Sequence, residues 1–511
     1  MNTGFLYGKM LITMFISLYS TRLILSALGV DDFGVFNLVS GVIGMLTFLN
    51  GAMAVSTQRY LSYHLGAGEM SRLKSVFNTS VLIHLIIGTV VVLALEIAGF
   101  FLFRGGLNIP EDRIFAAKWI YQFMIISTFF TINAVPYDAT INAHENMLFD
   151  AITGIFEAVV KLGIAFLILY TLVDKLILYG VLIASLTILI RVIKSIYCIR
   201  KYEECKIRQK PDRDKVLFRE MFSFGGWNLF GAFCNVAKNQ GLAIILNLFI
   251  GVVANAAFGI ANQVNSQLAA FSANIIKAMN PQIVKSEGAG DRSRMLWLAM
   301  LACKFSFFLL AFFAVPLIIE MHYILNIWLE SVPEYAVIFC QLILIMSLFQ
   351  QITWGLMVAV QSVGRIKLYQ FVVGSLLILN LPLSVAALKM GFPAYSVLIV
   401  SILLELTAGG ARVFFARRLT GLDPRVFLGN IVFKSFLTIG LAAAFALIPG
   451  FFMKEGFLRL VVTVLVSSGF ILLIARYIGM TKDEVERIRD MALSLLRGLL
   501  NRVSKKARVR A

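Results

Sequence analysis

Basic side chains inside apolar segments are the most informative chemical feature of this sequence. Arg22, Lys238 and Lys304 each lie more than a helical turn inside a long apolar segment, and none has an adjacent acid. A charge in the hydrocarbon costs about 2.5–3.5 kcal/mol even on insertion scales, so it persists where water, a partner or a substrate offsets that cost. Guanidinium and ammonium groups hold phosphate oxygens through charge-assisted hydrogen bonds. The three bases therefore predict a cavity for an anionic substrate.

Other intramembrane bases have simpler explanations. Glu157 precedes Lys161 by four residues, which predicts an ion pair along one helix face. Arg191 and Lys194 lie close enough to a segment end to extend toward the membrane surface. These three bases are therefore not expected to bind a substrate.

Glu405 is the most central acid of the apolar segments. Arg412 follows it by seven residues and lies on the same face of the expected helix. Glu405 is either a group that couples transport to a cation or a structural counter-ion of a buried base. We favour the structural role.

Two consecutive apolar segments, 221–249 and 252–279, are unusually rich in amides. Such a density of amides facing lipid would be very unfavourable, because the hydrocarbon offers them no hydrogen-bond partner. Hydrogen bonds between packed helices explain three or four of these side chains, and a hydrated cavity explains all of them, so we favour the cavity. The polar residues of the two segments are Asn228, Asn235, Lys238, Asn239, Gln240, Asn247, Asn255, Asn262, Gln263, Asn265, Ser266, Gln267 and Asn274.

The elements that position these residues are membrane-spanning helices. Hydrophobic residues make up 59% of the 511 positions and charged residues 14%, and the mean hydropathy is +0.85. A helix needs about 20 apolar residues to cross roughly 30 Å of hydrocarbon. The sequence predicts an all-α polytopic membrane protein with about fourteen spans, near 5–28, 33–57, 76–103, 114–142, 149–172, 176–199, 221–249, 252–279, 295–319, 335–360, 368–388, 393–416, 427–449 and 456–478. The first is too long and too polar for a signal peptide.

The net charge of +18 is distributed over alternate loops. One set of loops carries most of the Lys and Arg residues, including the segment 201–220, and the other set is mixed or acidic. By the positive-inside rule the basic loops and both termini are cytoplasmic. This distribution also argues against nucleic acid as a partner.

A repeat with a period of 222 residues divides the chain. Gly29 corresponds to Gly251, and the loop Gly66-Ala67-Gly68-Glu69 corresponds to Gly288-Ala289-Gly290-Asp291. Such repeats are typical of transporters built from two related halves. We expect a six-helix lobe at 1–200, a basic linker at 201–220, a second six-helix lobe at 221–418, two further helices at 419–480 and a basic amphipathic tail at 481–511, the last lying on anionic lipids or simply solvated.

Signals for covalent chemistry are lacking in the sequence. The five Cys residues show no CxxC spacing, and no GxxxxGK[ST] motif occurs. We therefore expect no metal, no cofactor and no catalytic residues.

The segments TRLILSALGVDDFGVFNLVSG and STQRYLSYHLGAGEMSRLKSVF resemble the start of the polysaccharide transporter family, the Wzx-type O-antigen flippases. Their superfamily also contains lipid II flippases and multidrug exporters. The resemblance implies a central cavity between helices one, two, seven and eight, and adds Arg22, Asn37 and Gln58 to the candidate residues. The multidrug branch typically has a carboxylate in its first helix, whereas this chain has Arg22 and no acid there.

The sequence thus predicts a flippase for an undecaprenyl-pyrophosphate-linked oligosaccharide, used in O-antigen, capsule or exopolysaccharide synthesis. The predicted cavity residues are Arg22, Asn37, Gln58, Asn235, Lys238, Asn239, Asn262, Asn265, Ser266 and Lys304, with Glu405 as a coupling group or counter-ion. The expected location is the bacterial inner membrane, as a monomer that contacts anionic lipids and works beside polysaccharide polymerase and chain-length proteins. The alternatives are a cation-coupled exporter and, in another class, a membrane glycan polymerase or ligase.

Overall fold

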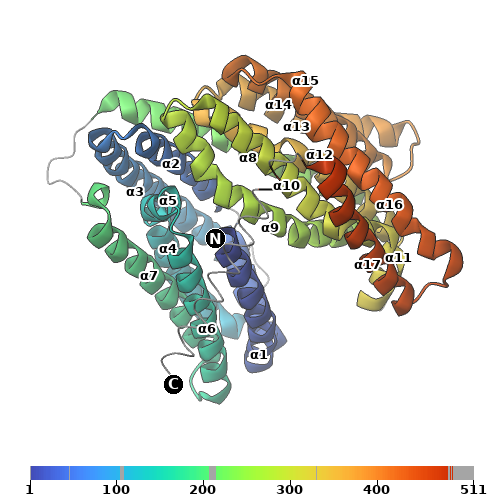
Figure 1. Cartoon of the computed structure of the whole chain (residues 1–511). Coiled ribbons are helices and arrows are strands. Elements are labelled where there is room, and N and C mark those ends of the chain that lie inside the picture. Colours follow the sequence, from blue (N-terminus) through green and yellow to red (C-terminus); the bar gives the residue numbers. More distant parts are fainter. Residues whose placement is uncertain are drawn as a thin grey trace, which may run out of the picture.

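A computed structural model describes residues 2–44, 47–103, 109–206, 214–329 and 331–480, together with Glu484 and Glu486. The predicted amphipathic tail lies outside the described residues, apart from these two glutamates. The described chain is helical, with short turns between the helices (Figure 1).

The first half of the chain forms the N-lobe, which consists of helices α1 to α7. Their bounds are α1 Asn2–Gly44, α2 Thr47–Ala67, α3 Met70–Phe101, α4 Ile114–Asn133, α5 Val135–Ala143, α6 Met147–Tyr170 and α7 Lys175–Lys201. Helix α1 holds two spans, because its backbone leaves the helical region at Gly29.

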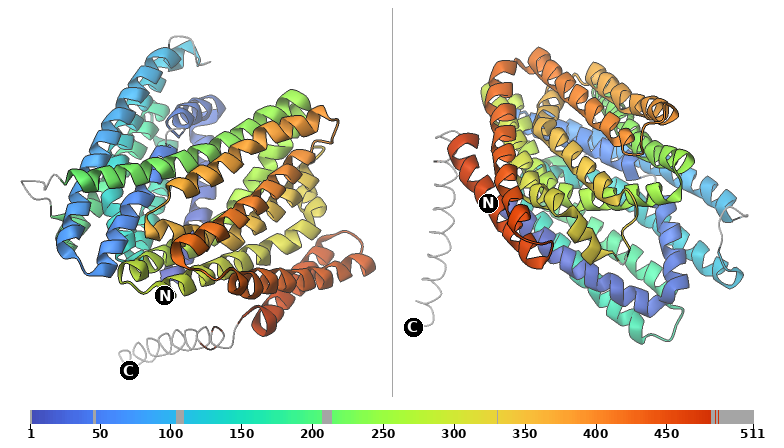
Figure 2. Two further views of the ribbon diagram at one scale, coloured as in Figure 1. Left: turned by 90° about the horizontal axis from the view of Figure 1, so that it is seen from above. Right: turned by 90° about the vertical axis from the view of Figure 1, so that its right-hand side faces the viewer.

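The second half forms the C-lobe, α8 to α14, followed by three further helices. The bounds are α8 Lys215–Phe249, α9 Val252–Gly288, α10 Arg292–Ile319, α11 Met321–Trp328, α12 Ala336–Val363, α13 Lys367–Lys389, α14 Ser396–Thr420, α15 Pro424–Phe427, α16 Lys434–Phe452 and α17 Phe457–Ile474. Helices α16 and α17 pack against each other and against α10, on the outside of the C-lobe (Figure 2). Helix α8 begins at Lys215, inside the segment that we assigned to the linker.

The membrane-spanning character of the fold is confirmed. Among the described residues, 12 helices are long and apolar enough to cross a membrane. They match twelve of the predicted spans. The described residues of the other two, 33–57 and 252–279, are helical but more polar. The first belongs to the second part of α1 and to α2, and the second belongs to α9. The prediction of about fourteen crossings agrees with this arrangement.

The backbone shows the repeat that the sequence predicts. Gly29 has φ 79° and ψ 172°, and Gly251 has φ 115° and ψ −175°. Both conformations are open to glycine and strained for other residues, so the same sharp bend occurs at the end of the first span of each lobe. Glu69 and Asp291 both precede a helix, with φ/ψ of −88°/75° and −87°/73°.

Helix partners are repeated as well. In the N-lobe α1 packs on α6, α3 on α4, and α4 on α7. In the C-lobe the corresponding pairs are α8 with α13, α10 with α12, and α12 with α14.

The two lobes meet where α2 and α9 end. A methyl group at Gly66 would overlap the backbone of Lys285, and one at Gly288 would overlap the backbone of Tyr63. These two contacts are equivalent under the 222-residue repeat, so α2 and α9 cross about a pseudo-two-fold axis at this point. Glycine is required because the two backbones approach too closely for a side chain.

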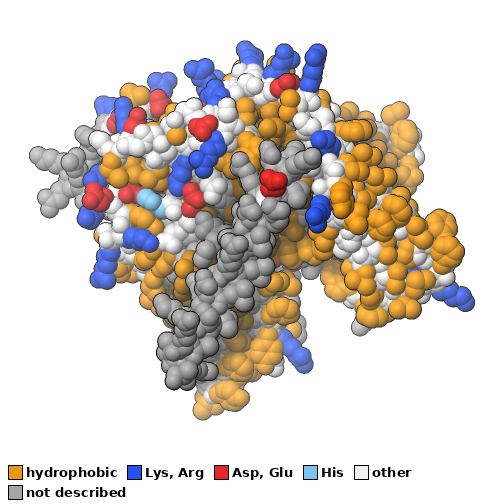
Figure 3. Space-filling view, viewed as in Figure 1, with side chains coloured by type: hydrophobic (Ala, Val, Ile, Leu, Met, Phe, Trp, Pro, Cys, Tyr) orange, Lys and Arg blue, Asp and Glu red, His pale blue; other side chains and the backbone are white. Residues whose placement is uncertain are grey.

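The hydrophobic core shows that the lobes are joined at one end. One buried cluster runs from the C-lobe into α2, α5, the first part of α3 and the end of α7, whereas α1, α4, α6 and the remaining parts of α3 and α7 contribute a separate cluster of the N-lobe. Lys and Arg side chains gather at the joined end, at the top of Figure 3, which we call the basic face. At the opposite face the two lobes are separated by a gap (Figure 3).

A candidate substrate cavity in the C-lobe

A cavity of about 270 Å³ lies in the C-lobe beside α2 of the N-lobe. Helices α8, α12, α13 and α14 form its walls, and Gly51, Ala52 and Val55 of α2 cover one side. Its polar lining comes from Asn228, Asn235, Lys238, Gln350, Gln361, Tyr369, Gln370 and Arg412.

Three amides organise one end of this cavity. Asn228 Oδ1 accepts hydrogen bonds from Gln361 Nε2 at 3.1 Å and from Gln370 Nε2 at 2.8 Å. Asn228 Nδ2 donates to the carbonyl of Phe224, one turn earlier in α8. Gly231 lies so close to Gln370 that a β-carbon there would overlap the amide. The network joins α8, α12 and α13 and fixes the wall of the cavity.

Lys238 is the chemically distinctive residue of the cavity. Its side chain is 6% exposed, and within the described part of the chain it makes no ion pair or hydrogen bond. The second cation, Arg412, is neutralised, because its Nη1 lies 2.6 Å from Glu405 Oε1 and 3.0 Å from Thr353 Oγ1. The cavity therefore carries one uncompensated positive charge, which suits an anionic group with several oxygen acceptors.

Glu405 is thus paired with Arg412 of its own helix. Both side chains are buried, at 3% and 6% exposed. Glu405 thus lies as a counter-ion of Arg412, and its role in coupling or in structure stays a prediction. Among the described residues, no carboxylate lies within ion-pair distance of Lys238.

The predicted residues of α8 and α9 are not all brought together. Asn235 lines the cavity, and Asn239 is exposed and donates to Asn235 Oδ1 at 3.4 Å. In α9, Asn262 donates to the carbonyl of Phe258, and Ser266 donates to that of Gln263.

Asn265, also in α9, accepts a hydrogen bond from Ser347 Oγ of α12 at 2.6 Å. This bond fastens α9 to its neighbour in the C-lobe. The amides of α9 therefore serve local and inter-helix hydrogen bonds, and none of the predicted α9 residues lines the cavity around Lys238.

The N-lobe candidates lie apart from this cavity. Arg22 and Asn37 are exposed on α1, and Gln58 is half-buried on α2, next to Arg59. Arg22 forms no ion pair with any described residue.

The prediction that Lys304 is an unpaired base was wrong. Its ammonium group lies 2.8 Å and 3.0 Å from the two carboxylate oxygens of Glu484, and its side chain is 1% exposed in the C-lobe. The two residues are 180 positions apart. No local pattern in the sequence signals this pair.

Among the other bases, the pairing of Lys161 with Glu157 at 2.8 Å is confirmed. Arg191 and Lys194 have an acidic partner that the sequence did not indicate, and their extension toward the membrane surface stays a prediction. Arg191 lies 3.1 Å from Asp138, and the buried Lys194 lies 2.9 Å from the same carboxylate. Asp138 forms an ion pair with both bases, and Lys194 also lies 3.3 Å from Asp150.

Sequence reasoning missed a charge cluster centred on Asp150, at the start of α6. Its carboxylate forms ion pairs with Lys9 of α1 at 3.1 Å, with Lys194 of α7 at 3.3 Å and with Lys277 of α9 at 3.0 Å. The last of these pairs crosses between the lobes. The available signal was an acid within the otherwise basic set of loops.

A second inter-lobe cluster lies beside it. Glu145 accepts hydrogen bonds from Lys285 Nζ at 2.8 Å and from Gln282 Nε2 at 3.0 Å, both on α9. Other bonds between the N-lobe and α9 lie between the end of α9 at the basic face, Gly288, and its midpoint. Within the described ranges, the last of them toward the opposite end joins Tyr7 Oη to the carbonyl of Phe271, at 2.7 Å. The lobes are therefore bonded over the basic half of the molecule.

Comparison with solved structures shows the class of fold. A mutant of a MATE protein superposes with a TM-score of 0.70 at 12% identity, covering 82% of this chain and 96% of that one. The MATE transporter ClbM, solved with Rb⁺, gives a TM-score of 0.68 at 16% identity over 84% and 96% of the two chains. A MOP superfamily transporter from Pyrococcus furiosus gives 0.66 at 14% identity over 82% and 95%.

No curated protein sequence matches the chain. A family model described as "Polysaccharide biosynthesis protein" matches residues 2–287, which is more than half of the chain. The matched region contains the whole N-lobe and the helices α8 and α9. The chain belongs to the polysaccharide biosynthesis protein family, and it shares its fold with the MATE transporters.

Proposed function

We propose that this protein carries a polyprenyl-diphosphate-linked oligosaccharide from the cytoplasmic to the periplasmic leaflet of a bacterial inner membrane. A charged headgroup with attached sugars cannot cross the hydrocarbon unaided, because its desolvation is too costly. A cavity that opens to each face in turn removes that barrier. The family supports a polysaccharide precursor as the cargo.

The observation that carries the proposal is the ammonium group of Lys238, which has no ion pair among the described residues and lies in a cavity whose polar lining is mostly amides. Gln361 and Gln370 already donate hydrogen bonds to Asn228, whereas Lys238 makes no hydrogen bond with a described residue. In this proposal Lys238 holds a phosphate oxygen of the headgroup, and Asn235 and Gln350 contact sugar hydroxyls. Arg22 supplies a second cation from the N-lobe.

The arrangement of the lobes supports alternating access. Their bonds are confined to the basic half, and the space between them is open at the opposite face (Figure 3). By the distribution of Lys and Arg, we assign the basic face and both termini to the cytoplasm. This state therefore releases cargo to the periplasm, and the reverse state requires the inter-lobe bonds to break. The protein acts as a monomer, with polysaccharide polymerase and chain-length proteins as its neighbours.

The test is transport by Lys238 variants in proteoliposomes that contain a fluorescent diphosphate-linked oligosaccharide lipid. Lys238→Gln should slow translocation at least about tenfold, since a charge-assisted hydrogen bond contributes about 1.5–3 kcal/mol. Lys238→Arg should keep more activity than Lys238→Gln. Lys161→Gln is the matched control, because it removes one lysine charge from a span of the other lobe. Normal translocation by a well-folded Lys238→Gln protein would contradict the proposal.

A cation-coupled exporter is the second candidate, because solved MATE transporters share the fold. Expression in a drug-sensitive strain distinguishes the two. Drug resistance that persists when the strain lacks lipid-linked glycans would favour the exporter.

A further inference from the structure

A second and larger cavity opens at the basic face. Its volume is about 940 Å³, near the upper end of the range of about 300–1,000 Å³ typical of ligand sites. Residues of α2, α8, α14 and the turn between α12 and α13 line it, so it spans the boundary between the lobes. None of the substrate-cavity residues that we predicted from the sequence lines this second cavity.

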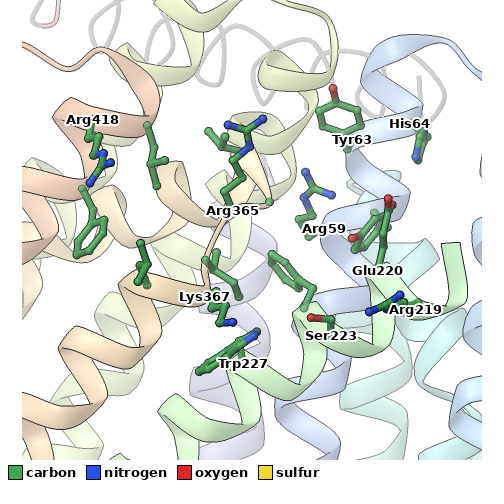
Figure 4. Close-up of a pocket in the computed structure, with 18 residues that line it drawn as sticks. Arg59, Tyr63, His64, Arg219, Glu220, Ser223, Trp227, Arg365, Lys367 and Arg418 are labelled. Carbon is green, nitrogen blue, oxygen red and sulfur yellow. The ribbon is translucent and has the colours of Figure 1, made fainter. Parts of the chain in front are cut away.

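Five cations from four elements converge on this cavity. They are Arg59 of α2, Arg219 of α8, Arg365 and Lys367 at the start of α13, and Arg418 of α14. Figure 4 shows them around one opening, together with the aromatic rings of Tyr63 and Trp227. The cavity contains one acid, Glu220.

The pairing of these bases differs from that of other bases on the same face. Several other bases of the basic face contact carboxylates, in the pairs Arg72 with Asp214, Lys74 with Glu203, Lys285 with Glu145 and Arg292 with Glu287. Across the described ranges, none of the five cations of the cavity lies within ion-pair distance of an acid. The positive-inside rule explains basic residues on this face, but it does not explain why five bases without an ion pair line a single cavity.

The guanidinium group of Arg59 is held in place by hydrogen bonds and by two aromatic rings. Its Nε and Nη2 donate to the carbonyl of Ser362 at 3.3 Å and 2.9 Å, at the end of α12. The guanidinium also lies over the rings of Tyr60 and Tyr63, at 4.6 Å and 4.9 Å from their centroids. Arg59 thus connects the N-lobe to the C-lobe.

Lys367 and Trp227 form a cation–π pair in the wall of this cavity. The ammonium group of Lys367 lies 5.6 Å from the centre of the Trp227 ring, within the range of a cation–π contact (Figure 4). A ligand that draws Lys367 away from the ring changes the surroundings of the indole. Trp227 is therefore a built-in reporter of binding in this cavity.

We propose that this cavity is a diphosphate-binding site on the cytoplasmic side, separate from the cavity around Lys238. Planar guanidinium groups bind phosphate oxygens in pairs, and several of them directed at one space suit a doubly phosphorylated group better than a single carboxylate. If the proposed function holds, the site receives the diphosphate of the lipid-linked cargo before translocation. The same chemistry would also admit a soluble diphosphate.

Binding is measured without transport, so failure of the flippase proposal would not decide this one. The protein in lipid nanodiscs carries Phe in place of its other Trp residues, at positions 119, 297, 328 and 354, and the fluorescence of Trp227 is followed. One arm titrates inorganic pyrophosphate, and the other titrates farnesyl diphosphate, which adds an isoprenoid chain. Sulfate is the control anion.

A saturable change in Trp227 fluorescence with pyrophosphate is expected, and sulfate should bind more weakly. Arg365→Gln and Arg418→Gln should each weaken binding about tenfold, because each removes a charge-assisted contact. Both residues are exposed, so the variants are expected to fold, and an unchanged melting temperature checks this. Arg294→Gln, at another exposed position of the basic face, is the matched control and should bind normally.

Tighter binding of farnesyl diphosphate than of pyrophosphate supports a lipid-borne ligand, and equal binding supports a soluble diphosphate in the same site. Three results would overturn the proposal: no saturable change, normal binding by the Arg365→Gln, Arg418→Gln double variant, or equal weakening by Arg294→Gln. The last would mean that the general charge of the face attracts the anion.

Discussion

The two ion pairs between α9 and the N-lobe should set the balance between the two access states. Lys277 contacts Asp150 at 3.0 Å, and Lys285 contacts Glu145 at 2.8 Å. Both pairs join the lobes at the basic face and must break when the protein opens there. Changing both lysines to Gln removes the pairs and leaves Lys9 and Lys194 to neutralise Asp150.

The free energy that the two ion pairs contribute can be estimated from how far their lysine side chains are buried. The side chains of Lys277 and Lys285 are 38% and 28% exposed, so each pair lies between an exposed ion pair, worth about 0–1 kcal/mol, and a buried one, whose rupture costs about 3–5 kcal/mol. With solvent screening we assign about 1 kcal/mol to each pair. Together they contribute about 2 kcal/mol, which changes the ratio of the two states roughly 30-fold.

Electron–electron distance measurements on spin labels provide the assay. Labels at Leu172, after α6, and Met390, after α13, report the separation of the lobes at the face opposite the basic one. Both positions are exposed, and the five native cysteines are buried. The Lys277→Gln, Lys285→Gln protein should show a larger population at short distance than the native protein.

The control keeps the same change in charge but leaves the lobe contacts intact. Lys74→Gln with Lys201→Gln removes two lysines of the basic face that contact only N-lobe residues, Glu203 and Tyr197. This control should leave the distances unchanged. An unchanged distribution in the Lys277→Gln, Lys285→Gln protein, or an equal shift in the control, would refute the reasoning.

Three further predictions concern the charges of the spans and the orientation of the chain. Arg22→Ala should abolish export of surface glycan at normal protein levels and Arg22→Lys should restore part of it, because lysine keeps the charge but not the planar fork; normal export by Arg22→Ala would rule out its role. Lys304→Met should lower the melting temperature strongly, since breaking a buried pair costs about 3–5 kcal/mol, and adding Glu484→Gln should recover most of the loss; no recovery would exclude a simple ion-pair role. A cysteine at Lys210 of a Cys-free variant should resist periplasmic labelling in intact cells, and labelling there would invert the proposed topology.

The sequence by itself determined the membrane-spanning character and the approximate number and positions of the spans, the repeat and the basic face. Each of these is a local or periodic property. A window of about 20 apolar residues is sufficient to identify a span, and the loop charges are read directly from the chain. The positive φ of Gly29 and Gly251 could be anticipated because only glycine adopts it without strain. The pair of Glu157 with Lys161 was predictable for the same reason, since four residues along one helix fix the geometry.

Only the tertiary structure decided which charges have partners. Lys304 meets Glu484 across 180 positions, and Lys277 meets Asp150 across 127. Such pairs depend on the rotation and packing of whole helices, which the spacing along one helix does not determine. For the same reason the sequence could not show that Lys238 remains unpaired while Glu405 is neutralised by Arg412, nor that five bases from four separate elements converge on one cavity at the basic face.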